Sequence, residues 1–156
     1  MVSLFLRNLF LTLLQPGIVA GAIPYYLLKS ASFPAPADTT LQRTIGIVIG
    51  LLGLVLMFDC IYRFASEGKG TLSPADPTQK LVLRGMYRYS RNPMYLGVMG
   101  ILLGEAIFWN HGWLWAYSAF IGLAFHTFIV FREERRLLHD FGDEYLRYCK
   151  KVRRWL

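Results

Sequence analysis

Charged residues are scarce in this chain, and acidic residues are the scarcest. Asp and Glu number 10 against 17 Lys and Arg in 156 residues, and charged residues make up only 17% of the chain. A typical soluble domain has about 25% charged residues, whereas hydrophobic residues here reach 54%. The apolar residues form runs with basic residues at their edges. This pattern favours a membrane protein over a basic domain that binds nucleic acid.

Cysteine and the common ligand-binding motifs are also rare. Cys60 lies in an apolar run and Cys149 in the basic tail, so the sequence predicts neither a disulfide framework nor a metal site. The Gly-Lys-Gly at 68–70 has no strand before it, which argues against a phosphate-binding loop. No A-x-A-like cleavage site follows the first apolar run, and we expect that run to be a retained membrane segment.

Four apolar runs are predicted to cross the membrane as helices; the first is long enough for about 30 Å of hydrocarbon, and the last two are short. They lie at about 9–28, 41–64, 93–109 and 113–131. A turn at Asn110-His111-Gly112 separates the last two runs, so they should form an antiparallel helical hairpin. The predicted fold is all-α, a single polytopic membrane domain that covers residues 1–156.

Two polar segments complete the predicted domain. The connection at 65–92 contains the string GKGTLSPADPTQ, whose glycines and prolines exclude a continuous helix. The tail at 132–156 has apolar residues at three- and four-residue steps among basic ones. This spacing predicts an amphipathic helix on an anionic membrane surface, with a break at Gly142.

The distribution of positive charge predicts the orientation. Six Lys and Arg residues lie between Arg63 and Arg91, eight lie in the tail from Arg132, and the turn at 110–112 has none. The positive-inside rule then places both termini and the long connection in the cytoplasm.

The stretch at 84–104, RGMYRYSRNPMYLGVMGILLG, changes from basic and aromatic to apolar at Asn92-Pro93. Asn is a favoured N-cap and Pro is favoured at the first helical position, so a helix should begin here. Its free N–H groups and positive dipole end could bind an anion. The alternative is a capped membrane helix with basic flanks and no ligand. Gly46 and Gly50, four residues apart on the second run, predict a close helix–helix contact.

The predicted topology gathers polar residues at the cytoplasmic rim of the bundle. They come from the end of the second span, the start of the third and the end of the fourth: Asp59, Tyr87, Arg88, Arg91, Asn92, Tyr95, His126, Arg132, Glu133 and Glu134. Ionisable groups within spans usually face the protein interior or a polar cavity. His126 and Glu133 are seven residues apart and should share a helical face. A purely structural alternative is an Asp59–His126 hydrogen bond between helices, and Glu105, deeper in the bundle, is expected to pair with Arg43.

Two motifs together resemble a known family. The string LVLRGMYRYSRNPMYLG, followed about 30 residues later by REERRLLHDFGDEYLRYCKKV, is similar to the isoprenylcysteine carboxyl methyltransferase family. It also resembles the related phosphatidylethanolamine N-methyltransferases, which have the same Asn-Pro-Met-Tyr string. The resemblance covers about 71–155. It implies an integral membrane methyltransferase that uses S-adenosylmethionine (SAM) without a Rossmann fold, with the cofactor in a cytoplasmic pocket beneath the last helical hairpin.

The resemblance also implies a set of cofactor contacts in this chain. By position they are Gln79, Lys80, Leu81, Val82, Tyr87, Asn92, Pro93, Met94, Tyr95 and Glu133. These residue types suit the cofactor, because helix N-terminal amides bind carboxylates and a glutamate binds ribose hydroxyls or an ammonium group. Tyrosine rings suit adenine or a sulfonium cation. Many carboxyl methyltransferases of the family have His where Asn92 stands.

One departure concerns the methyl acceptor, which should reach the site from the bilayer. The family's arginine for the substrate carboxylate corresponds to Ile129, so only Arg91 or Arg132 could take its place. The acceptor is therefore expected to be either a prenylcysteine-like carboxylate or a lipid amine. An amine must first lose a proton, and His126 or Glu134 is then the candidate base.

Two other functions fit the same scaffold. Membrane sterol and steroid reductases, which use NADPH, resemble this family in an Arg-x-Pro-x-Tyr turn at the same place. A non-catalytic membrane scaffold is the third alternative. Binding of SAM, of NADPH or of neither separates the three.

Overall fold

The computed structural model describes residues 16–30, 39–67 and 80–156. Every regular element in these ranges is a helix, and one isolated bridge pairs Ser90 with Arg153. The all-α prediction is therefore confirmed. Residue Gln79 and the first part of the first predicted span, 9–15, lie outside the described residues.

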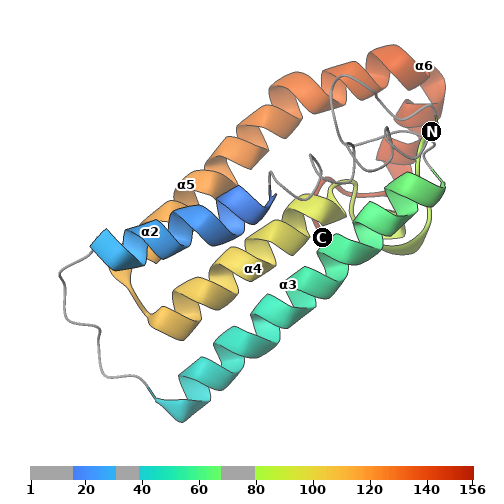
Figure 1. Cartoon of the computed structure of the whole chain (residues 1–156). Coiled ribbons are helices and arrows are strands. Elements are labelled where there is room, and N and C mark those ends of the chain that lie inside the picture. The colour runs from blue at the N-terminus through green and yellow to red at the C-terminus, as the bar shows by residue number, and fades with distance from the viewer. Residues whose placement is uncertain (1–15, 31–38, 68–79) are drawn as a thin grey trace, which may run out of the picture.

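The long helices lie side by side (Figure 1). Helix α3 spans Thr40–Ser66, α4 spans Pro93–Trp109 and α5 spans Gly112–Phe128. The chain reverses between α4 and α5 through Asn110, whose φ of 43° is left-handed, and His111, which caps α5 by accepting from the Trp113 N–H. This is the predicted helical hairpin, and it brings α4 and α5 into contact.

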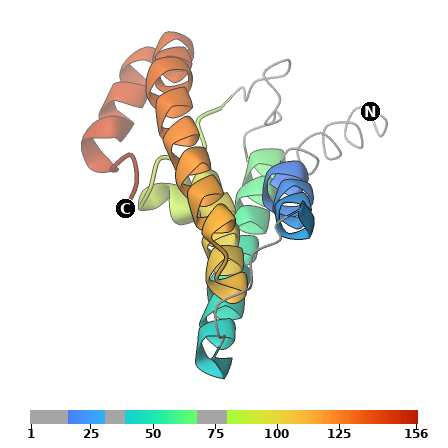
Figure 2. The ribbon, with the colours of Figure 1, turned by 90° about the vertical axis from the view of Figure 1, so that its left-hand side faces the viewer.

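The helical path that begins with α5 does not stop where the fourth apolar run ends. It continues through a π-helical turn, η3 (Ile129–Glu133), into α6 (Glu134–Lys151), and the three elements form one long helical path (Figures 1 and 2). Near the N-terminus, η1 (Ile18–Ala22) and α2 (Ile23–Ser30) pack beside α5, where the Tyr117 hydroxyl donates to the Val19 carbonyl at 2.8 Å. A short 3-10 helix, η2 (Gly85–Arg88), precedes α4.

Helices α3 and α4 touch along their backbones. A Cβ at Gly53 would lie 2.6 Å from the Gly97 carbonyl oxygen, and one at Gly104 would lie 2.7 Å from the Gly46 carbonyl oxygen. Small residues allow such close approach between membrane helices. The close contact predicted from Gly46 and Gly50 is present, and the glycines of the third run pack against the second span.

The surfaces of the helices are largely apolar. The helical stretches Thr40–Arg63 and Gly112–Lys151 contain segments long and apolar enough to cross a membrane, and Pro93–Trp109 is a shorter apolar helix. Only 28% and 17% of the two apolar segments are buried within the protein. Leu52 and Val55 on α3 are 65% and 66% exposed. Since water disfavours such a surface, a lipid environment accounts for it better than a soluble core does.

The tail is helical and breaks at Gly142, where φ is 50° and ψ is −124°. Part of its apolar face packs against the rest of the protein, while Leu138 and Leu146 stay exposed. Tyr145, Tyr148 and Val152 are buried and pack with Leu81 from the segment before η2. The amphipathic pattern of the tail therefore reflects in part contact with the rest of the protein, and its contact with a membrane surface stays a prediction.

Two expected pairings are not formed among the described residues. The Asp59 carboxylate accepts from the Arg63 guanidinium at 2.9 Å, one helical turn away, and does not bond to His126. Arg43 lies over the Phe108 ring at 5.9 Å, and the Oε2 atom of Glu105 is buried without a hydrogen-bond partner. The Asp59–Arg63 pair packs against Gly85, where a Cβ would collide with the guanidinium.

Candidate functional site

The site is built around the N-terminus of α4. Asn92 is the N-cap residue and Pro93 the first helical residue, as predicted. The Asn92 side chain makes no capping hydrogen bond, and its Nδ2 donates to the Arg154 carbonyl oxygen at 3.0 Å. The side chain that normally satisfies first-turn N–H groups is therefore directed elsewhere.

A short extended segment, Val152–Trp155, lies across the turn before α4, and we call it the strap. It forms the parallel bridge between Ser90 and Arg153, and the Arg91 N–H donates to the Arg153 carbonyl at 2.9 Å. The Ser90 hydroxyl donates to the Arg154 carbonyl at 3.3 Å. These bonds fix the end of the tail against the start of α4.

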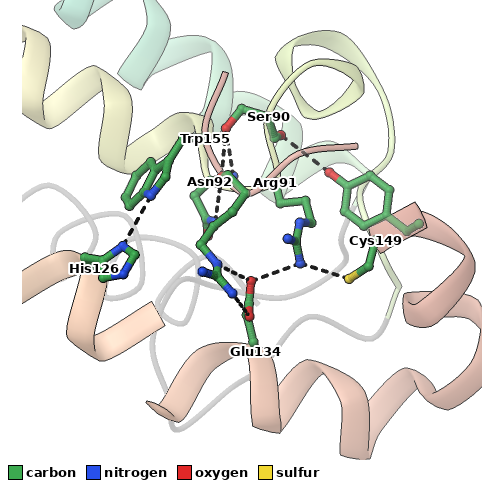
Figure 3. Close-up of polar contacts among 9 residues, drawn as sticks. Ser90, Arg91, Asn92, His126, Glu134, Cys149 and Trp155 are labelled. Atoms are coloured by element: carbon green, nitrogen blue, oxygen red, sulfur yellow. Dashed lines mark hydrogen bonds and ion pairs between the residues drawn. The ribbon is translucent and has the colours of Figure 1, made fainter. Parts of the chain in front are cut away.

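An ion cluster joins the strap to α6 (Figure 3). Arg154 donates from Nε and Nη2 to the two oxygens of Glu134, each at 2.9 Å, and Arg91 Nη1 lies 2.9 Å from Glu134 Oε1. Arg91 also contacts the Cys149 sulfur at 2.9 Å. Two guanidinium groups on one carboxylate leave one positive charge in excess.

The cluster determines the charge state of Glu134, which lies beyond the predicted span at 113–131. Burial alone would raise the pKa of Glu134. The hydrogen bonds from Arg154 and the positive charges of Arg91 and Arg154 outweigh burial and hold that pKa below its ordinary value of about 4.5. Glu134 is therefore a carboxylate at neutral pH.

The neighbouring Glu133 contacts a different part of the site. The Tyr95 hydroxyl donates to Glu133 Oε2 at 2.6 Å, and the Phe125 ring packs edge-on against Tyr95 with centroids 4.8 Å apart. Burial raises the pKa of Glu133, and the bond from Tyr95 opposes that shift only in part. Glu133 and Tyr95, both predicted cofactor contacts, thus lie together.

The π turn explains which residues face the same side. Phe125 and Glu133 both face Tyr95, while His126 and Glu134 both face the strap; within each pair the residues are eight positions apart. A π turn contains one residue more than an α turn, because its hydrogen bonds run from i to i+5. The seven-residue spacing of His126 and Glu133 therefore does not place them on one face.

His126 is exposed and lies under the strap. Its Nδ1 accepts a hydrogen bond from the Trp155 indole N–H at 3.3 Å, and the two rings are stacked with centroids 6.1 Å apart. Arg132 is exposed and makes no ion pair with any described residue. Of the four predicted catalytic residues, Arg91 and Glu134 are in direct contact, His126 joins them through the strap and Arg132 stands apart.

The predicted contacts before α4 mainly anchor the segment itself. Val82 and Tyr87 are buried with Cys60, and Met94 packs against them. Leu81 packs on the tail, Lys80 is exposed, and Pro93 is fully buried. Tyr148 donates to the Tyr87 carbonyl at 2.6 Å, and burial raises the pKa of its phenol. This part of the chain positions the turn at Ser90–Asn92.

Several residues of the site were missed by sequence reasoning: Ser90, Tyr148, Cys149, Arg154 and Trp155. All but Ser90 belong to the tail, whose amphipathic pattern suggested a surface helix. Because Glu134 and Arg154 are 20 residues apart, no local pattern marks their pairing. Among the described residues, no group of three His, Cys, Asp or Glu side chains could hold a metal ion.

Comparison with known proteins identifies the family of the chain. The sequence profile of the phospholipid methyltransferase family matches residues 41–144. The chain belongs to this family. An uncharacterized protein of Haemophilus influenzae is 41% identical over 63 residues, which are 40% of this chain and all of that protein. No solved structure is significantly similar to the chain. Family membership and the long apolar helices together identify a membrane methyltransferase.

Proposed function

We propose that the protein transfers a methyl group from SAM to a lipophilic acceptor at the cytoplasmic face of a membrane. The observation that carries the proposal is the N-terminus of α4, which its own N-cap side chain leaves uncapped beside Tyr95 and Glu133. A helix N-terminus favours an anion, and a nearby carboxylate favours a cation or hydroxyl groups. SAM carries a carboxylate, an ammonium group and ribose hydroxyls, and it supplies an electrophilic methyl group when bound.

In this proposal, the protein binds the reactants and excludes water. The first-turn amides of α4, after Asn92 and Pro93, receive the cofactor's carboxylate, and Glu133 binds its hydroxyls or ammonium. The family resemblance adds further cofactor contacts from the segment before α4 and from its first turn, namely Lys80, Leu81, Val82, Tyr87 and Met94. Alignment of two reactants contributes strongly to such transfers, and a dry site limits hydrolysis.

The acceptor is either a lipid carboxylate or a lipid amine. Ile129 is fully buried and carries no charge, and Arg91 is held by Glu134, so a substrate carboxylate would have to compete for Arg91. An amine acceptor needs a base, and a carboxylate paired with two arginines is a weak one. Within this proposal His126 is therefore the better candidate base than Glu134.

The cofactor assignment can be tested with Glu133→Gln. We expect its SAM affinity in detergent, measured by calorimetry, to fall roughly tenfold or more, since hydrogen bonds to charged groups contribute about 1.5–3 kcal/mol. Glu144→Gln is the matched control, because Glu144 is exposed in α6, which directly follows the turn that carries Glu133. Equal affinities of the two variants would rule out Glu133 as a cofactor contact.

Transfer itself is tested with radiolabelled SAM and a membrane lipid extract. We expect label in the lipid fraction, and identification of the product would distinguish an ester from a methylated amine. Binding of NADPH in place of SAM would contradict the proposal and favour a reductase. Binding of neither would favour a scaffold.

A further inference from the structure

The contacts of the strap fall on the site rather than on the apolar core. The Arg154 carbonyl accepts from Asn92, and the Arg154 guanidinium binds Glu134. The Trp155 indole donates to His126. Figure 3 shows these groups converging from α4, α5 and α6. One residue, Arg154, joins two of these three elements.

We propose that Arg154 is a positioning residue of the methyl-transfer site. It acts through its side chain on Glu134 and through its carbonyl on Asn92, and it touches neither the methyl donor nor the acceptor. The inference rests on the proposed function, whose cofactor would bind at the start of α4.

The side chain sets the position of the Glu134 carboxylate. A bidentate arginine–carboxylate pair fixes both distance and plane, which a lysine cannot do. Both nitrogen–oxygen distances are 2.9 Å, and Glu134 keeps only 18% of its side chain exposed. Glu134 in turn holds Arg91, the residue immediately before the N-cap of α4. The position of the strap therefore determines, through Glu134 and Arg91, the position of the turn before α4.

The Arg154 carbonyl holds the Asn92 side chain away from the first-turn N–H groups of α4. Asn92 is a residue type that readily caps helices, yet its side chain bonds to the Arg154 carbonyl and caps nothing. If the strap left, the Asn92 side chain would be free to turn towards the first-turn N–H groups and occupy the place of an incoming carboxylate. The strap therefore leaves the first-turn N–H groups of α4 available to a ligand.

The test compares Arg154→Gln with Arg153→Gln, which removes the same charge from the same strap. The Arg153 side chain is exposed and makes no hydrogen bond or ion pair with a described residue. We expect Arg154→Gln to raise the dissociation constant for SAM at least tenfold and Arg153→Gln to change it less than twofold. Arg154→Lys should recover only part of the loss, because lysine restores the charge but not the pair of parallel hydrogen bonds to the Glu134 carboxylate.

A merely structural role would lower the melting temperature of Arg154→Gln and leave the SAM affinity of the folded protein unchanged. We therefore measure both quantities, and a double-mutant cycle with Glu134→Gln adds a third readout. Since both residues act through one contact, the double variant should bind SAM about as weakly as the weaker single variant. Losses that simply add would contradict the positioning role.

The wild-type protein separates the two proposals. If it binds SAM and the Arg154 and Arg153 variants bind equally well, only the role of Arg154 is overturned. If the wild-type protein binds no SAM, the proposed function is overturned together with this inference.

Discussion

At the scale of single residues, Glu134 holds the site together through its charge. It accepts from Arg154 and pairs with Arg91, and its pKa lies below its ordinary value of about 4.5. A carboxyl group with a lowered pKa in the folded state stabilises that state above its unfolded pKa. This contribution is lost as the pH falls through the lower, folded value.

The cluster should therefore weaken in acid. We expect the melting temperature of the wild-type protein to exceed that of Glu134→Gln at pH 7, and the gap to shrink as the pH is lowered below about 4.5. Thermal unfolding in detergent from pH 7 to pH 3.5 measures the gap. Burial is the main cause of the raised pKa of Glu133 and is present in both proteins, whereas the smaller contribution from the Glu134 charge is absent from the variant. A gap that stays constant with pH would contradict the charge network.

Sequence reasoning was most successful where a residue acts on its own backbone. Asn92 and Pro93 mark the start of α4, and Gly142 marks the break in the tail, because caps, proline and glycine have local conformational effects. It could not predict where the Asn92 side chain points. That direction depends on the Arg154 carbonyl, 62 residues away in the sequence.

At the scale of helices, the pair α3–α4 is held by glycine contacts. A Cβ at Gly104 would lie 2.6 Å from the Gly50 nitrogen and 2.7 Å from the Gly46 carbonyl oxygen. Backbone atoms cannot move aside as a flexible side chain does. The two helices would have to separate to make room.

Gly104→Ala should therefore destabilise the protein, by about 1–3 kcal/mol as for other overpacked sites. Chemical unfolding in detergent micelles measures this loss. Gly112→Ala is the matched control, since nothing lies within 4 Å of a Cβ placed there, and it should be neutral or slightly stabilising. Equal stability of the two variants would show that the close packing has little energetic importance.

The π turn shows why helical periodicity failed at the site. Spacing arguments assume 3.6 residues per turn, and the assumption holds along α3, where Gly46, Gly50 and Gly53 all face α4. It fails across Ile129–Glu133, because the wider π turn contains one extra residue. Residues on the same face before and after this turn are therefore eight rather than seven positions apart. Nothing in the string IVFRE marks this turn, and its place is defined only by the packed structure.

At the scale of the whole molecule, the apolar runs predicted the class of fold but not the layout of its parts. Hydrophobic length and charge distribution indicate a helical membrane protein before any contact is known. They cannot indicate that α5 continues into the tail, or that the tail folds back onto α4. Those features depend on contacts such as Glu134–Arg154 and Tyr148–Tyr87, between residues far apart in the chain.

The proposed orientation is a separate prediction. In a variant without native cysteines (Cys60→Ala, Cys149→Ser), we expect Gly112→Cys to react with a membrane-impermeant maleimide on intact cells. Lys150→Cys should react only after the cells are permeabilised, because the basic tail is predicted to be cytoplasmic. Both positions are exposed in the structure, so protein packing does not explain a difference. The reverse pattern would overturn the orientation.

Gly142 has a consequence that its own surroundings do not reveal. No atom lies within 4 Å of a Cβ placed there, so packing alone suggests that the position tolerates substitution. Its φ of 50° and ψ of −124°, however, suit glycine far better than other residues. The bend at Gly142 separates the helical turns that carry Glu134 from those that lead to Arg154. The backbone conformation of Gly142 therefore helps to bring Glu134 and Arg154 together, although Gly142 contacts neither residue.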